Sequence, residues 1–172
     1  MRPIQTEHLD LHPLSDFDRD AVVEILQNDT VKKTYMVPDI TSKEIGDRLF
    51  QRLKECSLSE EHYGAGVYFQ GELVGLLHDV EISGDKVEMG YAFHPRWHGR
   101  GFATEAFGAM MDVLFAQGVE EVLAGAFDTN LASLRVMEKC GMTRLDREES
   151  IHYRGNTYRC VYCSKRRLEN KT

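Results

Sequence analysis

Residues 94–106 constrain the fold more than any other part of this sequence, because they set two glycines between two strongly patterned stretches. They read His-Pro-Arg-Trp-His-Gly-Arg-Gly-Phe-Ala-Thr-Glu-Ala. The preceding run, residues 87–93, has the apolar and aromatic content of a strand. From about 101 to 117, apolar residues recur at helical spacing until Gly118 ends the pattern. The chain must therefore pass from a strand through a tight turn directly into a long helix.

Short strands linked by tight turns precede this segment. Strand-like runs lie at 66–69, 73–77 and 87–93, and glycine-containing triplets separate them. Connections this short join antiparallel neighbours, so the three runs predict a meander. The other periodic stretches predict an opening strand, helices at 15–26, 41–56 and 130–140, a strand at 122–127 and a hairpin turning at 154–156. This order predicts a mixed α/β fold with a mostly antiparallel sheet, in one domain spanning 1–172.

Two capping signals indicate where the first helices begin. Ser15 precedes an apolar stripe that starts at Phe17, so we expect the first helix to begin there. The capping-box pattern Thr-x-x-Glu begins at Thr41, and leucines follow it at fourfold spacing. Both helices are therefore expected ahead of the meander, in the N-terminal half.

Composition and charge exclude several classes of protein. Of 172 residues, 42% are hydrophobic and 28% are charged, and no apolar run could cross a bilayer, so we expect a soluble protein without a membrane partner. The net charge of -7 disfavours a nucleic-acid partner. Residues 1–86 carry 9 Lys and Arg against 17 Asp and Glu, which favours a cationic ligand on that half. The basic run at 165–167 is interpreted as a solvated tail.

Four cysteines require a check for a metal or disulfide framework. Cys160 and Cys163 lie three apart in an alternating, strand-like stretch, so their side chains point to opposite faces and cannot share a metal. No second pair at zinc spacing and no signal-peptide pattern is present. We therefore expect no metal site, reduced thiols and a cytoplasmic location.

The glycine turn itself predicts a seat for an anion. Small residues let main-chain N–H groups approach a ligand, and the first turn of a helix adds free amides and a positive dipole end. The turn lacks the third small residue of a dinucleotide-binding fingerprint, because Thr104 stands there, and the sequence contains no P-loop motif. A phosphate or pyrophosphate of another kind of ligand is therefore expected.

Four blocks of the sequence, at 6–14, 88–91, 99–106 and 130–142, resemble the GNAT superfamily of acyl-CoA-dependent N-acyltransferases. The likeness covers nearly the whole chain and is greatest to the branch of ribosomal-protein N-terminal (Rim-like) and polyamine acetyltransferases. The blocks at 99–106 and 130–142, in that order and spacing, carry the specific signal. The resemblance implies a GNAT-like domain in which a parallel pair of strands splays apart, with acetyl-CoA as co-substrate.

The resemblance also implies which residues bind acetyl-CoA. The family's pyrophosphate loop falls on residues 98–103, where His98 replaces the usual Gln or Arg. Main-chain groups of Tyr91 and Phe93 would pair with the pantetheine arm. The full set implied is Tyr91, Phe93, Arg96, His98, Gly99, Arg100, Gly101, Phe102, Ala103, Thr104, Asn130 and Ser133.

Catalysis is expected where the strand at 87–93 splays from its neighbour. The Tyr91 N–H would stabilise the developing oxyanion, as the resemblance implies. Glu88 is a carboxylate in an otherwise apolar strand, so it could take the proton of an ammonium nucleophile or hold that cation. Two alternatives stay open: Glu88 faces solvent or pairs with an arginine, or a carboxylate or imidazole of residues 78–81 (His78, Asp79 or Glu81) is the base.

The block at 130–142 departs from the family at one position. Asn130 reads locally as a helix N-cap, and the resemblance adds a hydrogen bond to pantetheine. Many members carry a Tyr seven residues later to protonate the leaving thiolate, but this chain has Met137, which cannot donate. Ser133 is therefore expected to contact the cofactor and to assist the leaving group.

Together these features predict acetyl transfer from acetyl-CoA to a primary amine, either a protein N-terminus or a small amine, by direct attack in a ternary complex. Catalytic roles fall to Glu88, Tyr91 and Ser133. A homodimer is compatible with the sequence. The alternative is a non-catalytic acyl-CoA-binding sensor, which Met137 in place of the usual tyrosine leaves open.

Overall fold

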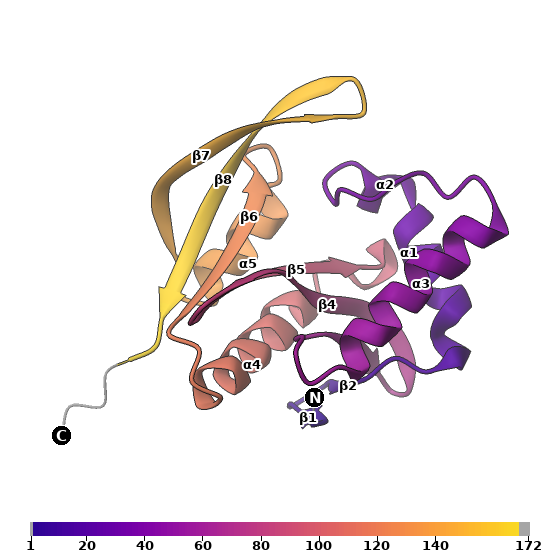
Figure 1. Ribbon diagram of the computed structural model, residues 1–172, viewed down its shortest axis with the longest axis horizontal. Helices are drawn as coiled ribbons and strands as arrows, with labels where there is room; N and C mark the ends of the chain where they lie inside the picture. Colours follow the sequence, from indigo (N-terminus) through magenta and orange to yellow (C-terminus); the bar gives the residue numbers. More distant parts are fainter. Residues whose placement is uncertain (1, 169–172) are drawn as a thin grey trace.

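One twisted sheet joins all eight strands found in residues 2–168, the part of the chain that the computed structural model describes (Figure 1). The order across the sheet is β1-β2-β3-β4-β5-β6-β8-β7, and every neighbouring pair there is antiparallel except β5 and β6. This confirms the predicted mixed α/β fold class. The strands are β1 (Ile4–Gln5), β2 (Asp10–His12), β3 (Ala65–Phe69), β4 (Glu72–Ser83), β5 (Lys86–Phe93), β6 (Glu121–Phe127), β7 (Thr143–Tyr153) and β8 (Asn156–Arg166).

Helices cover both faces of the sheet and create two apolar cores. The five α-helices of the described residues are α1 (Arg19–Gln27), α2 (Asp29–Lys32), α3 (Lys43–Leu58), α4 (Phe102–Ala116) and α5 (Leu131–Lys139). On one face, α4 and α5 pack on the central strands, with Phe107 and Met110 fully buried. On the other face, α1 and α3 pack around Ile25 and Phe50. The two faces of β5 therefore lie in different environments.

The start of the first helix differs from the prediction. A short 3-10 turn, Asp16–Asp18, precedes α1, and the Ser15 main-chain N–H donates to Asp18 Oδ2 over 2.7 Å. Phe17 is 97% exposed instead of lining the apolar stripe. A 3-10 turn has three residues per turn, so its side chains fall out of phase with the helix that follows. The cap of α3 is also shifted by one residue, because Ser42 and not Thr41 accepts from the Ile45 N–H.

The parallel pair β5 and β6 separates after three residues. Within the described chain, its register runs only from Lys86 opposite Glu121 to Glu88 opposite Leu123. Beyond that point each strand continues, but β5 pairs with β4 and β6 pairs with β8. The predicted splay is therefore present, and it opens at Glu88.

The β7–β8 hairpin turns where the sequence predicts and reaches away from the sheet. Arg154 and Gly155 both have positive φ values, 48° and 76°, as a two-residue hairpin turn requires. In Figure 1 the hairpin arches from the sheet toward α2. Its pairing is irregular between Arg144 and Glu148. The tip lies against the loop between α2 and α3.

The basic run at 165–167 is not a free tail, contrary to the prediction. The Lys165 ammonium donates to the Cys140 carbonyl at the end of α5 over 3.0 Å, and Arg167 pairs with Glu120. These cations neutralise exposed carbonyls and carboxylates beside β6. Cys163 packs in the core under α4, whereas Cys160 packs with Phe127 and Tyr162 in a third, smaller apolar cluster, as predicted for opposite faces of β8.

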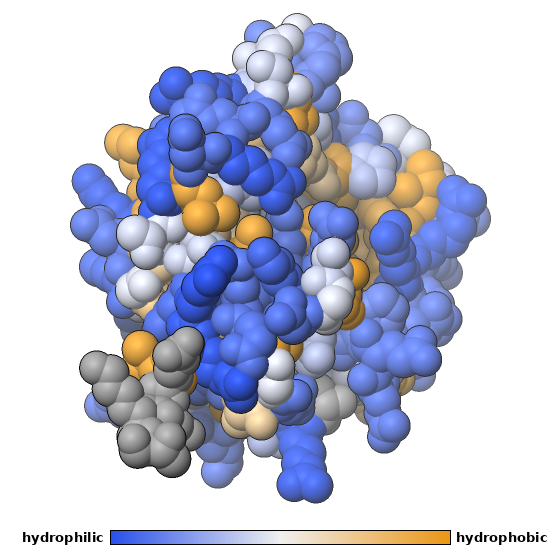
Figure 2. All heavy atoms as spheres, turned by 60° about the vertical axis from the view of Figure 1, so that its left-hand side comes forward, coloured by the Kyte–Doolittle hydropathy of each residue, from blue (hydrophilic) through white to orange (hydrophobic). Residues whose placement is uncertain are grey.

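The surface carries mostly hydrophilic side chains. On the face that Figure 2 shows, the apolar residues are scattered between charged and polar ones. Across residues 2–168, no helix combines the length and apolar character that a membrane span needs.

Candidate functional site

The glycine turn before α4 provides open space and free amides. Gly99 and Gly101 have φ values of 75° and 85°, which only glycine adopts without strain. A Cβ at either position would meet no described atom within 4 Å. Gly101 is the N-cap of α4, and no side chain among the described residues caps that helix, so its first amides are available. The turn therefore fits a pyrophosphate held mainly by main-chain donors.

Three side chains that the resemblance implies for phosphate binding are engaged within the protein. Arg96 pairs with Glu72, and the Arg100 guanidinium lies over the Trp97 ring at 5.0 Å. The His98 Nε2 donates to the Phe93 carbonyl over 2.9 Å, which ties the turn to the end of β5. This geometry makes His98 a support of the loop, while the amides at 102–104 remain the donors open to an anion.

Across the splay, β5 and the start of α5 meet through Tyr91 and Ser133. Asn130 caps α5, as predicted, by accepting from the Ser133 N–H over 3.2 Å. The Tyr91 hydroxyl lies 2.7 Å from the Ser133 Oγ, and its ring packs on Phe107. Burial raises the pKa of Tyr91, so its phenol stays protonated. The structure thus brings Tyr91, Asn130 and Ser133 together, with the hydroxyl groups of Tyr91 and Ser133 in contact.

Met137 lies in the core against α4 and is 1% exposed. Its thioether offers no proton. The hydroxyls of Tyr91 and Ser133 are accordingly the proton donors that the described residues place at this end of the splay.

Glu88 occupies the opposite face of β5. Its neighbours Val87 and Met89 enter the core under α4, so alternation turns the Glu88 carboxylate to the other side, where it is 14% exposed. Arg147 of β7 lies 3.9 Å away. Burial raises the pKa of Glu88, and Arg147 offsets part of that rise. Pairing with an arginine, one of the alternatives left open by the sequence, is therefore realised.

On the face of the sheet that carries Glu88, one glycine in β5 and one in β6 let aromatic rings lie against the main chain of these two strands. A Cβ at Gly90 of β5 would be 3.1 Å from the His78 ring, and one at Gly125 of β6 would be 2.8 Å from the Tyr162 ring. Neither glycine was predicted from the sequence to lie at the site. A glycine inside a strand often marks such a close approach, so this signal was available.

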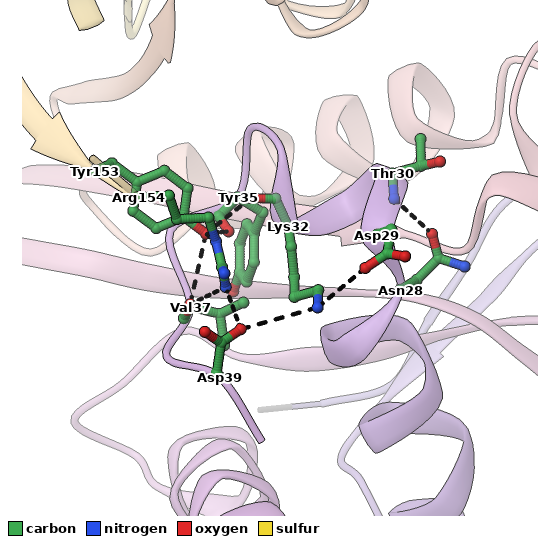
Figure 3. Close-up of polar contacts among 9 residues, drawn as sticks. All are labelled: Asn28, Asp29, Thr30, Lys32, Tyr35, Val37, Asp39, Tyr153 and Arg154. Carbon is green, nitrogen blue, oxygen red and sulfur yellow. Dashed lines mark hydrogen bonds and ion pairs between the residues drawn. The ribbon is translucent and has the colours of Figure 1, made fainter. Parts of the chain in front are cut away.

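The hairpin tip clasps the loop between α2 and α3 (Figure 3). The Tyr153 hydroxyl donates to the carbonyl of Lys32 at 2.8 Å and approaches that of Tyr35 at 3.2 Å. Arg154 pairs with Asp39 over 2.8 Å, and that hydrogen bond lowers the pKa of Asp39. These contacts, which we call the clasp, tie the hairpin tip to the loop between α2 and α3. Nothing in the local sequence pattern pointed to them.

Asp79, one of the alternative bases, faces away from the splay. Its carboxylate accepts from the Tyr63 N–H at 2.8 Å, lies 2.9 Å from His62 Nδ1 and accepts from the Cys56 thiol at 3.4 Å. The donor atoms of Cys56, His62 and Asp79 all lie within 4.8 Å of one another, so this is where the described residues could group around a metal. Because the carboxylate already has these partners, it serves to anchor the connection between α3 and β3.

Comparison with protein families gives a match over most of the chain. Residues 8–143 match the family model described as "Acetyltransferase (GNAT) domain". The FsC-acetyl coenzyme A-N(2)-transacetylase of Aspergillus fumigatus is 27% identical over 154 residues, which cover 83% of this chain. The chain spans 66% of that relative's length.

Solved structures of acetyltransferases share the fold. RimL, the ribosomal L7/L12 alpha-N-protein acetyltransferase in complex with coenzyme A, superposes with a TM-score of 0.82 at 15% identity, covering 96% of this chain and 98% of RimL. Spermidine N-acetyltransferase from Vibrio cholerae, in complex with CoA and spermine, gives 0.81 at 17% identity, covering 94% and 97%. At these identities the likeness establishes the fold alone.

Proposed function

Because the chain belongs to the GNAT acetyltransferase family and is therefore an acetyl-CoA-dependent N-acetyltransferase, we propose that it acetylates a primary amine by direct attack in a ternary complex. The observation that carries this proposal is the splay between β5 and β6. It has an uncapped helix start on one face and a half-buried carboxylate on the other, so donor and acceptor can meet through it.

The donor side is formed by main-chain groups. Acetyl-CoA supplies a thioester whose carbonyl carbon is the electrophile. Gly99, Gly101 and the amides of residues 102–104 would hold its pyrophosphate, and Asn130 would contact its pantetheine arm. The Tyr91 N–H, on the edge of β5 that is free beyond Glu88, would donate to the thioester oxygen. Such a donor is worth roughly 3 kcal/mol in the transition state.

The acceptor side is formed by Glu88. Glu88 is the last residue of β5 that pairs with β6, and its carboxylate would take a proton from the incoming ammonium or hold that cation near the thioester. Burial raises the pKa of Glu88, and the Arg147 guanidinium opposes that rise. Ser133, hydrogen-bonded to the Tyr91 hydroxyl, would donate to the leaving sulfur on the donor face. No acyl-enzyme step is needed, since the amine is the nucleophile.

The nature of the amine is the finer part of the proposal. The fold neighbours include a ribosomal-protein acetyltransferase and a spermidine acetyltransferase, which supports the Rim-like and polyamine branch. The excess of acidic residues in the half that carries α1 to α3 supports a cationic acceptor. We further propose a single cytoplasmic domain, and a homodimer remains a prediction.

A turnover assay tests this function. Release of CoA from acetyl-CoA would be followed with polyamines, N-terminal peptides and neutral or anionic amines, with CoA-induced thermal stabilisation measured in parallel. Turnover with at least one amine is expected. Stabilisation by CoA without release of CoA on any acceptor would instead support an acyl-CoA sensor.

A further inference from the structure

Tyr35 and His78 form a half-buried polar pair that the function proposed above does not use. Tyr35 lies in the loop between α2 and α3, and His78 lies on β4. The Tyr35 hydroxyl is 2.5 Å from the His78 Nε2. Tyr35 packs against the apolar core under α1, and the His78 ring lies edge-on to the Tyr35 ring, so an unpaired polar group there would be costly. Such a close pair in this environment calls for a definite proton arrangement.

The surrounding contacts define that arrangement. The His78 Nδ1 lies 2.9 Å from the carbonyl of Asp79, and a carbonyl can only accept, so Nδ1 carries a hydrogen. Burial lowers the pKa of His78, so the ring is neutral and its Nε2 is a bare acceptor. Burial also raises the pKa of Tyr35, so the phenol keeps its hydrogen and donates it to Nε2. Within residues 2–168 the Tyr35 hydroxyl oxygen has no other hydrogen-bond partner. Because its hydrogen is donated to His78, this oxygen can only accept from a further donor.

The pair lies next to the expected reaction centre. The His78 ring rests against Gly90, where a Cβ would be 3.1 Å from its Cε1 and Nε2 atoms. Gly90 is two residues from Glu88, on the same face of β5, and directly precedes Tyr91, whose N–H is proposed to bind the thioester oxygen. His78 pairs with Gly90 across the β4–β5 ladder, so β-strand register holds the imidazole in place.

We propose that Tyr35 and His78 form the proton relay for the acceptor amine. An N–H bond of the ammonium breaks as its proton passes to the Tyr35 oxygen, while the Tyr35 hydrogen passes to His78 Nε2. The amine keeps the electron pair for the new C–N bond, and the imidazolium later releases its proton to solvent. In this scheme Glu88 does not accept the proton but holds the ammonium cation. This inference rests on the proposed acetyl transfer.

The groups packed around the relay support a neutral imidazole that gains a proton only transiently. Arg52 of α3 opposes a positive charge on His78, the Asp79 carboxylate favours one, and Cys56 of α3 lies near the Tyr35 hydroxyl. Gly90 contributes no side chain. The clasp holds the main chain of Tyr35 through the Tyr153 hydroxyl (Figure 3), so the hairpin positions the first group of the relay.

Two variants separate proton transfer from hydrogen bonding. Tyr35→Phe removes the hydroxyl and keeps the ring. His78→Gln keeps an acceptor for the Tyr35 hydrogen but removes the titratable nitrogen. Tyr68→Phe is the matched control, because its hydroxyl is also hydrogen-bonded, to Asp18 at 2.9 Å, on the same apolar core. For each protein, kcat/KM would be measured from about pH 6 to 10 with the amine of the panel that the wild type acetylates fastest.

Both relay variants are expected to lose roughly 100-fold in kcat/KM near pH 7, and the loss is expected to shrink toward pH 10, where free amine is abundant. CoA-induced stabilisation should stay at the wild-type level, and Tyr68→Phe should keep the wild-type profile. A wild-type profile for His78→Gln, or a Tyr35→Phe loss no larger than that of Tyr68→Phe, would overturn the relay. A wild type that acetylates no amine would overturn the proposed function itself, and the relay with it.

Discussion

Replacing Gly101 with alanine should separate the two tasks of the glycine turn, which are to shape the chain and to leave room for a ligand. At a φ of 85°, a side chain costs about 1–2 kcal/mol, and alanine recovers part of that by restricting the unfolded chain. The added Cβ meets nothing within 4 Å among the described atoms, so no clash adds to this cost. For a chain of this size the net loss lowers the Tm by roughly 2–6 °C.

The same variant should lose most of its response to CoA. At a CoA concentration about 100 times Kd, the wild type gains about 2.7 kcal/mol of stability, which raises its Tm by roughly 5–10 °C. A Cβ at Gly101 occupies the space through which a phosphate would reach the first amides of α4. If affinity falls about 100-fold, the same CoA concentration stabilises by only about 0.4 kcal/mol.

Gly118→Ala provides the matched control for this measurement. Gly118 follows the other end of α4, with a φ of 96° and likewise no described atom within 4 Å of its Cβ position. Its alanine variant should show a similar loss of stability in differential scanning fluorimetry, but the full CoA response. Equal CoA-induced shifts in the two variants would refute the assignment of the turn to the pyrophosphate.

Three further predictions follow from the charged groups. Glu88→Gln should lower turnover more than it lowers CoA affinity, and the loss of turnover should be smaller at high pH, where the amine is already neutral. Unchanged turnover near pH 7 in steady-state assays would contradict the proposed role of Glu88 in accepting the proton or holding the cation. Burial acts to raise the pKa of Glu105, but hydrogen bonds from Thr6 and His8 outweigh burial and lower that pKa. The Glu105 carboxylate therefore stabilises the folded protein above its unfolded pKa of about 4.3. This stabilisation is lost as the pH falls through the lower pKa of the folded state. Urea unfolding of Glu105→Gln should therefore show a loss of about 1–3 kcal/mol at neutral pH that narrows in acid, and a constant loss would contradict this account. The half-saturating concentration of a cationic acceptor should rise with salt in initial-rate assays, and a salt-independent value would remove the electrostatic argument.

Local signals predicted the parts of the molecule that depend on few neighbours in sequence. The glycine turn, the Asn130 cap and the 154–156 hairpin each require a particular backbone conformation over a few residues, and the sequence at those places allows little else. The prediction that Phe17 begins the apolar stripe of the first helix was wrong for a local reason. A single 3-10 turn precedes α1 and puts Phe17 out of phase with the buried residues of that helix.

The contacts on the acceptor face could not be predicted in the same way. Tyr153 meets Tyr35 across 118 residues, and both residues lie outside any periodic pattern. Arg147 reaches Glu88 from a stretch of β7 whose pairing with β8 is irregular, so neither alternation nor register points to it. Such meetings depend on how the whole sheet twists and on where a long hairpin ends, which are properties of the assembled fold.

The position of the clasp has a consequence for how such an enzyme can diversify. The family match ends at residue 143, where β7 begins, whereas Tyr153 and Arg154 lie beyond it at the far end of the hairpin. The proposed donor side would rely on main-chain amides and glycines, which tolerate little change, while the clasp relies on a few side chains at the hairpin tip. On the proposed function, mutations at the tip would therefore alter the acceptor side and leave the glycine turn proposed to hold acetyl-CoA unchanged. On the proposed function, a few substitutions at the hairpin tip would be enough to change which amine this scaffold accepts.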